Sequence, residues 1–201
     1  MKHLCKIILF VVLFFCIAIP VLGDFDPDID YSVRMVEAIL AGDDTAGYEA
    51  QRERDEKIAS LGLDYAPIDY GELLLLSQLI YTEAGSYWLG TEWKMAVGEV
   101  VLNRVASPEF PDTLREVITQ PGQYHGPAEG FLDYVSPNRD SINAALRILS
   151  GERVINDPAV VFQSNMVLGS GVALELWDEN LGSTFLCYSS RMDLYRSEKS
   201  C

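Results

Sequence analysis

Histidine and cysteine are scarce in this chain of 201 residues, which has two histidines and four cysteines. His3 belongs to the N-terminal segment, so His125 is the one histidine left for the rest of the chain. This excludes a zinc site built on two or three histidines. A Cys187–His125 nucleophilic pair is an alternative, but no residue near Cys187 indicates an activated thiolate. We therefore expect no metal site and no cofactor, and we look to carboxylate chemistry.

Positive charge is also scarce. Lys and Arg number 15 against 30 Asp and Glu, which gives a formal net charge of −15. Binding to nucleic acid or to anionic lipid needs clustered Lys and Arg, so neither partner is expected. We interpret the excess of acids as a solvated surface that does not by itself indicate a substrate.

Residues 1–23 have the features of an export signal. Residues 7–19 form an unbroken apolar run, and Gly23, with Val21 two positions before it, suits cleavage by a signal peptidase. The basic residues that precede the run are Lys2, His3 and Lys6. The remainder of the chain is therefore expected outside the cytoplasm, either secreted or associated with the cell wall or membrane.

An uncleaved membrane anchor is the alternative, because residues 4–22 approach the ~20 apolar residues that span a bilayer. Cys16 could indicate a lipoprotein, but Phe15 is too bulky for the usual lipobox. Outside this segment the cysteines are Cys187 and Cys201. They either form a disulfide that fixes the C-terminus or remain free thiols, as they would in an anaerobe.

Residues 24–67 are expected to form an acidic helical spacer. The pattern predicts helices over 31–41 and 45–61, each stopped by a glycine. Such a spacer would hold the catalytic part away from the membrane, and partial disorder is the alternative.

Residues 68–201 are expected to form the catalytic domain. Apolar periodicity and capping residues predict helices over 73–84, 93–105, 113–119 and 140–150, and strands over 159–162 and 183–188. The predicted fold class is therefore α+β and mostly helical, with a small late β element.

Glu83 is the carboxylate that stands out in this pattern. It follows Leu76, Leu79 and Ile80 on the apolar face of the predicted helix, at that helix's last turn. Partial burial favours the protonated form of a carboxyl group and raises its pKa, as a general acid requires. A glutamate at a helix end is more often capped or solvated, so this position alone is a weak signal.

Four motifs in a fixed order strengthen the assignment of Glu83. They are LIYTEAG at 79–85, AVGEVVLNRV at 96–105, FPDT at 110–113 and VITQPGQY at 117–124. Together they resemble the SleB/CwlJ cell-wall hydrolase family, known for spore cortex-lytic enzymes. The resemblance extends over roughly 68–188 and implies a lysozyme-like or lytic-transglycosylase-like fold. It also implies cleavage of peptidoglycan between N-acetylmuramic acid and N-acetylglucosamine, with Glu83 as the catalytic acid.

The chain departs from the family pattern in the loop 85–94, which is about two residues longer. Glu99 stands where a small residue is common, so it is a candidate second acid. A partner to Arg104 or a backbone role is the alternative. By residue type we expect substrate contacts from Gln123, Tyr124, Gln163 and Asn165, with loop capping or core packing as alternatives.

The sequence thus predicts an exported enzyme that cleaves peptidoglycan glycan strands, most simply as a lytic transglycosylase. Two alternatives stay open. One is a muramidase that activates water, and the other is a cell-wall-binding protein of the same fold without activity.

Overall fold

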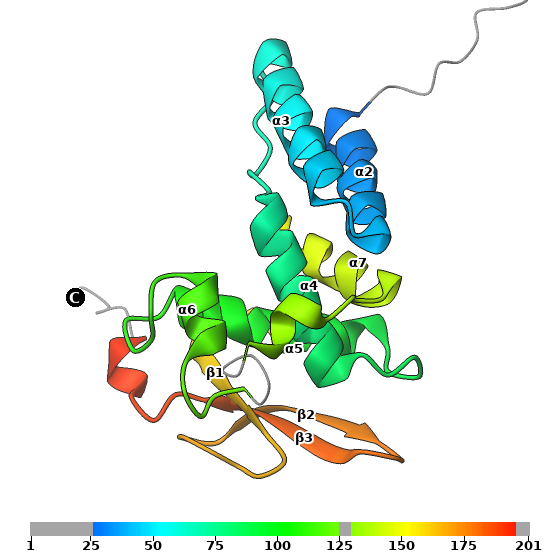
Figure 1. Ribbon diagram of the computed structural model, residues 1–201. Helices are drawn as coiled ribbons and strands as arrows, with labels where there is room; N and C mark the ends of the chain where they lie inside the picture. Colours follow the sequence, from blue (N-terminus) through cyan, green and yellow to red (C-terminus); the bar gives the residue numbers. More distant parts are fainter. Residues whose placement is uncertain (1–25, 125–129, 196–201) are drawn as a thin grey trace, which may run out of the picture.

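The computed structural model describes residues 26–124 and 130–195, whose arrangement Figure 1 shows. In chain order the helices and strands are α2 (Pro27–Ala41), α3 (Asp44–Leu61), α4 (Tyr70–Ala84), α5 (Thr91–Val105), α6 (Leu114–Thr119), the 3-10 helix η2 (Phe131–Tyr134), α7 (Arg139–Leu149), β1 (Val160–Ser164), β2 (Val172–Asp178), β3 (Gly182–Tyr188) and the 3-10 helix η3 (Met192–Leu194). The predicted class, α+β and mostly helical with a small late sheet, is confirmed.

Helix α4 is the centre of the molecule. Leucine and isoleucine occur on almost every side of it, and Leu73, Leu76, Leu79 and Ile80 are fully buried. A helix that is apolar all round must be covered on several faces. Helices α5, α6 and α7 and the 3-10 helix η2 pack against it, so its C-terminal end is held rigidly inside the domain.

Helices α2 and α3 form an antiparallel hairpin at the end of the molecule opposite the sheet (Figure 1). Each helix ends where the sequence predicts, at Gly42 and Gly62, both with a left-handed backbone. Met35, Ile39 and Ala50 of the hairpin are buried in the same apolar core as α4 and α7. The hairpin therefore packs onto the domain that follows it.

The sheet has the order β1-β3-β2 and is antiparallel throughout. Strand β1 lies against α5, through a small apolar cluster that includes Ala96, Val100, Val160 and Leu186. Strand β2 is an edge strand that pairs only with β3 and carries exposed residues along its length. The β2–β3 turn reaches beyond this cluster toward the end of α4.

Most predicted helices and strands are confirmed, with shifts of a few residues at their ends. Strand β2 was not predicted. It follows a Gly-Ser-Gly turn and contains Glu175 and Asp178, so its sequence resembles an acidic loop.

Among residues 26–124 and 130–195, no helix has both the length and the apolar character needed to cross a membrane. The predicted export signal at 1–23, His125 and Cys201 lie outside the described residues. Cys187 lies on the central strand β3, and its thiol is buried.

Candidate active site

Glu83 lies in the last turn of α4, half-buried, with its helix neighbours Leu79 and Ile80 buried behind it. Its side chain lines a groove of about 810 Å³. The groove has one wall from α4 and the residues after it, and another from the segment that follows η2. Leu181, in the β2–β3 turn, borders it as well. The sheet and the helices thus meet at the carboxylate.

The chain directly after Glu83 is fixed from two sides. The Asn138 side-chain amide donates a hydrogen bond to the Gly85 carbonyl oxygen (3.1 Å). The Lys94 ammonium donates to the carbonyl oxygens of Ser86 (3.0 Å) and Leu89 (2.7 Å). Lys94 is wholly buried, and this burial lowers the pKa of its ammonium group. The loop that departs from the family pattern therefore has a defined conformation.

Arg104 and two aromatic rings, those of Phe110 and Tyr124, form a cluster. The guanidinium of Arg104 lies 5.0 Å from the ring centre of Phe110 and 5.2 Å from that of Tyr124. Tyr124 is buried, and the pKa of its hydroxyl is raised to about 12. Burial is the largest cause of this rise. The positive charge of Arg104 lowers this pKa and the negative charge of Glu83 raises it, so both groups lie within electrostatic reach of the hydroxyl.

Two polar atoms of this cluster have no hydrogen-bond partner within the part of the chain that the structure describes. They are the Tyr124 hydroxyl and the Nη1 of Arg104. A buried donor without a partner is costly, and such groups tend to occur at functional sites. Tyr124 thus holds a buried, neutral O–H donor, and the charge of Arg104 is held over its ring.

Glu99 has a different role from the predicted second acid. It is fully buried in the middle of α5, and its carboxylate accepts three backbone N–H bonds, from Val154 (2.7 Å), Ile155 (2.9 Å) and Asn156 (2.7 Å). Its two oxygen atoms are occupied and it does not line the groove. The alternative of a backbone role is the one that the geometry supports.

The other polar residues of the second motif, Asn103 and Arg104, also form hydrogen bonds to backbone groups. Asn103 donates to the carbonyl oxygens of Asp157 and Val160, each at 3.0 Å. The Nε of Arg104 donates to the carbonyl oxygen of Val161 at 2.6 Å. Together with Glu99, these side chains attach the segment that leads into β1 to helix α5.

The remaining predicted contact residues are not brought to the groove. Gln123 is exposed in the loop after α6, and Asn165 is exposed after β1. Gln163 is half-buried on β1, where its Oε1 atom has no partner among the described residues. Tyr124 does not line the groove either, but the charge of Glu83 raises the pKa of its hydroxyl.

Sequence reasoning missed Tyr134, Ser136 and Leu181, which line the groove. Tyr134 is 87% exposed and therefore free to stack on a ligand. Trp88 and Trp177, exposed by 45% and 69%, lie on the loop after Glu83 and on β2. None of these residues belongs to a motif, and a large exposed aromatic side chain cannot be told from a buried one by its letter.

Within the described ranges, no group of three or more His, Cys, Asp or Glu side chains is placed to hold a metal ion.

Comparison with known proteins identifies a family segment. Residues 90–171 match the family model described as Cell Wall Hydrolase. This range contains the second, third and fourth motifs and begins a few residues after Glu83.

The chain is similar to two spore cortex-lytic enzymes. The one from Halalkalibacterium halodurans is 34% identical over 98 residues, which cover 48% of this chain and 28% of that protein. The one from Bacillus cereus is 35% identical over 81 residues, which cover 40% of this chain and 30% of the relative. The chain thus spans less than a third of the length of these relatives.

Two solved structures also match. The catalytic domain of the Bacillus cereus SleB protein aligns with 25% identity and a TM-score of 0.45, over 59% of this chain and 91% of that one. The catalytic domain of the germination-specific lytic transglycosylase SleB from Bacillus anthracis aligns with 23% identity and a TM-score of 0.45. The alignment covers 59% of this chain and 96% of that one. The resemblance to the SleB/CwlJ cell-wall hydrolases that the motifs indicate is confirmed by the match of residues 90–171 to the Cell Wall Hydrolase model and by the similarity to spore cortex-lytic enzymes.

Proposed function

We propose that this protein cleaves the glycan strands of peptidoglycan between N-acetylmuramic acid and N-acetylglucosamine, as a lytic transglycosylase with Glu83 as acid and then base. The observation that carries the proposal is the half-buried Glu83 carboxylate at the end of α4, which opens on the large groove. The family match and the names of the relatives, spore cortex-lytic enzymes, support peptidoglycan as the substrate.

The proposed reaction needs one carboxyl group. The protonated Glu83 donates its proton to the glycosidic oxygen, and the bond between that oxygen and the muramoyl anomeric carbon breaks. The muramoyl 6-hydroxyl oxygen then bonds to the same carbon, and its proton passes to the Glu83 carboxylate. The residue ends the cycle protonated, as it began. The strand is divided into two fragments without water, and one fragment carries a 1,6-anhydro end.

The composition of the groove favours this route over activation of water. A glycosidase that uses water or a carboxylate nucleophile places a second carboxyl group ~5 to 9.5 Å from the acid. Among the described residues that line the groove, Glu83 is the only acidic one. Glu99 is engaged by three backbone amides.

Tyr124 and Arg104 are proposed as positioning residues. The Tyr124 hydroxyl stays protonated at neutral pH and can donate to the Glu83 carboxylate when that group has lost its proton. The charge of Arg104, fixed by its bond to the Val161 carbonyl oxygen, would stabilise the same ionised state.

Sugar rings are proposed to stack on Tyr134, which lines the groove, and on the exposed Trp88 and Trp177. Such a substrate lies outside the cytoplasm, which agrees with the export signal predicted at 1–23. The membrane would be contacted only through that segment, if it is not removed.

Mass spectrometry of soluble fragments tests the proposal. Purified protein, its Glu83→Gln variant and a Glu72→Gln control are incubated with peptidoglycan. Glu72 lies exposed in the first turn of the same helix, so the control makes the same chemical change away from the groove. We expect anhydromuropeptides from the wild type and the control, and none from Glu83→Gln.

Other products would decide between the alternatives. Reducing-end muramic acid would replace the transglycosylase proposal with hydrolysis by water. Binding to the wall by wild type and Glu83→Gln alike, with no fragment released from any peptidoglycan, would identify a binding protein and reject catalysis.

A further inference from the structure

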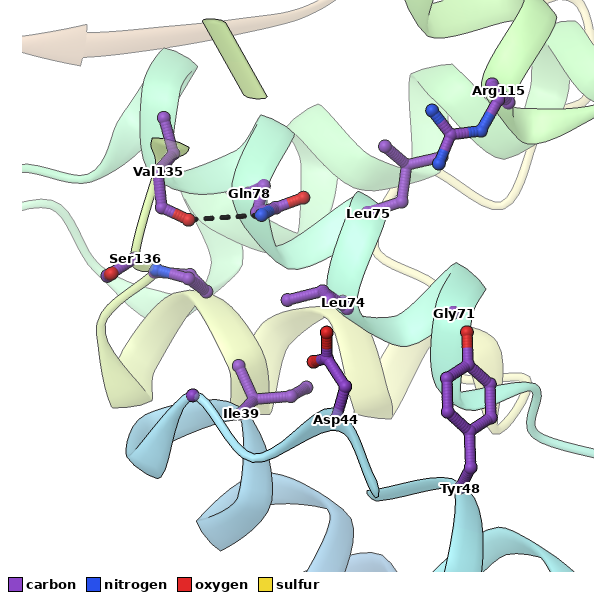
Figure 2. Close-up of a pocket in the computed structure, with 12 residues that line it drawn as sticks. Ile39, Asp44, Tyr48, Gly71, Leu74, Leu75, Gln78, Arg115, Val135 and Ser136 are labelled. Atoms are coloured by element: carbon purple, nitrogen blue, oxygen red, sulfur yellow. Dashed lines mark hydrogen bonds between the residues drawn. The ribbon is translucent and has the colours of Figure 1, made fainter. Parts of the chain in front are cut away.

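A second hollow lies along α4, on the side of the α2–α3 hairpin. Its volume is about 390 Å³, and Figure 2 shows its lining. The hairpin contributes Asp44 and Tyr48, α4 contributes Gln78, and α6 contributes Arg115. In Figure 2 the Asp44 carboxylate and the Tyr48 hydroxyl are directed from the hairpin toward α4. The hairpin, which precedes the family segment, thus forms one wall of a pocket.

This hairpin pocket adjoins the groove of Glu83. Both hollows are bordered by Val135 and Ser136. Gln78, which lines the hairpin pocket, precedes Glu83 on α4 by about 7.5 Å along the helix axis, at 1.5 Å per residue. The Gln78 side-chain amide donates to the Val135 carbonyl oxygen at 3.1 Å and fixes the segment between the two hollows. The two hollows thus share a border, and a ligand that occupied both would cross Val135 and Ser136.

The wall that the hairpin supplies is firmly placed. Gly47 lies against the ring of Tyr70, where an added Cβ would come within 2.1 Å of a ring atom. The Tyr70 hydroxyl donates to Asp44 at 3.0 Å, and its backbone N–H donates to the Gln51 side-chain oxygen at 2.7 Å. Tyr48 packs edge-to-face on the Tyr70 ring at 4.9 Å. The pocket is therefore built into the fold.

The hairpin pocket carries opposite charges on different elements. Asp44 is exposed at the start of α3, and Arg115 is exposed on α6. Among the described residues Arg115 forms no ion pair, in contrast to Arg34, Arg52 and Arg139. A ligand with both a carboxylate and an amino group matches this arrangement, whereas the uncharged hydroxyls of a glycan would leave both charges unused.

We propose that the hairpin pocket binds the peptide stem of the muramoyl residue that Glu83 processes. Arg115 pairs with a stem carboxylate, and Asp44 pairs with the side-chain amino group of a diamino acid in the stem. The inference rests on the proposed function, since it assigns the peptide part of the same substrate. It makes the protein selective for strands that carry peptides.

Binding of the free stem peptide is the direct test, because it does not depend on cleavage. A diamino-acid-containing tetrapeptide is titrated into the full chain and its Arg115→Ala, Asp44→Asn and Arg52→Ala variants, with calorimetry as the readout. Arg52 is the control, since it is exposed on the outer side of the same hairpin and pairs with Glu56. We expect Kd to rise about tenfold in Arg115→Ala, less in Asp44→Asn and not in Arg52→Ala. Equal affinity in Arg115→Ala and Arg52→Ala, or no binding to wild type, would overturn the inference.

Cleavage of two substrates separates this inference from the proposed function. Glycan strands are compared with and without their peptides, the latter after amidase treatment. We expect Arg115→Ala to lose about tenfold in kcat/KM on peptide-bearing strands and nothing on stripped strands. An equal loss on both would show that Arg115 serves the glycan or the fold. A wild type that binds the peptide and cleaves neither strand would reject the proposed function and leave the pocket assignment standing.

Discussion

Glu83 and Glu99 lie on adjacent helices of one core, yet their surroundings give them different properties. Glu99 is wholly buried and has three backbone N–H groups on its two oxygen atoms. Glu83 is half-buried at a helix end and faces a groove, beside a tyrosine hydroxyl without a partner among the described residues. A carboxylate whose hydrogen bonds are complete holds backbone in place and stabilises the fold. One that opens on a groove can exchange a proton with a ligand.

The comparison also explains the second motif. Its Glu, Asn and Arg are the residues most suggestive of chemistry in the sequence, but all three bind backbone of the segment around β1. They hold the sheet against α5, and the sheet carries the β2–β3 turn to the groove. The motif therefore acts on the site through the position of the sheet.

Replacing Glu83 should have the largest effect. We expect Glu83→Gln to lower kcat on peptidoglycan by about 10² to 10⁴, the usual contribution of a general acid. Its free energy of unfolding should stay within ~0.5 kcal/mol of the wild type, because the side chain is half-exposed. Fragment release and urea denaturation measure the two quantities. A large loss of stability in Glu83→Gln would show that Glu83, like Glu99, serves mainly to stabilise the fold.

For Glu99→Gln we expect the opposite result, a large loss of stability and little loss of kcat. A neutral amide accepts weaker hydrogen bonds and turns donors toward backbone N–H groups, so the free energy of unfolding should fall by about 2–3 kcal/mol. Urea denaturation with an unchanged m-value measures this loss. The protein that remains folded should retain kcat within about twofold, as transition-state contacts are intact. A loss of kcat as large as that of Glu83→Gln would restore Glu99 as a second acid.

Tyr124→Phe tests whether the buried hydroxyl serves function at the expense of stability. The ring contact with Arg104 is kept, and removal of an unpartnered hydroxyl should raise the free energy of unfolding by ~1 kcal/mol. The kcat should nevertheless fall by about tenfold, because the ionised Glu83 loses a neighbouring donor. Lower stability together with unchanged kcat would indicate simple packing.

The same variant has a signature in alkaline solution. The pKa of Tyr124 is about 12 in the folded protein and about 10 when unfolded, so between these values the folded state binds more protons. The free energy of unfolding therefore keeps its full value below pH 10 and falls as the pH rises toward 12. The free energy of unfolding, measured by denaturation at each pH in this range, should decline less steeply for Tyr124→Phe than for the wild type.

The smallest effect is expected at Asn138, which supports the loop after Glu83. Its oxygen caps α7 by accepting from the Ser141 N–H (2.9 Å), and its amide donates to Gly85. Asn138→Asp keeps the cap and loses the donor, whereas Asn138→Ala loses both. We expect both variants to reduce kcat about threefold, but only Asn138→Ala to lose ~1 kcal/mol of stability. Full activity in Asn138→Asp would show that this bond does not position Glu83.

The sequence predicted most helices because their signals are local. Asp43, Asp69 and Thr113 cap their helices, Gly42 and Gly62 stop theirs, and apolar residues follow helical spacing. Strand β2 was not predicted because it is an edge strand with acidic, exposed residues, whose pairing with β3 is a tertiary property.

For the candidate site, the sequence could single out Glu83 because a carboxyl group on an apolar helix face is a local anomaly. It left Glu99 open between a second acid and a backbone role, since the amides that occupy Glu99 come from more than 50 positions further along the chain. Gln163 and Asn165 were assigned by residue type alone, and neither lines the groove. The groove residue Leu181 joins the site only through the β2–β3 turn.

The unequal exposure of the tryptophans gives the protein a built-in optical probe. Trp93 is buried in the core, whereas Trp88 and Trp177 are exposed. Their fluorescence should therefore contain a blue-shifted part that acrylamide cannot quench and a red-shifted part that it can. A glycan strand lying in the groove would shield the second part alone, so its arrival and departure could be followed in real time without any attached label.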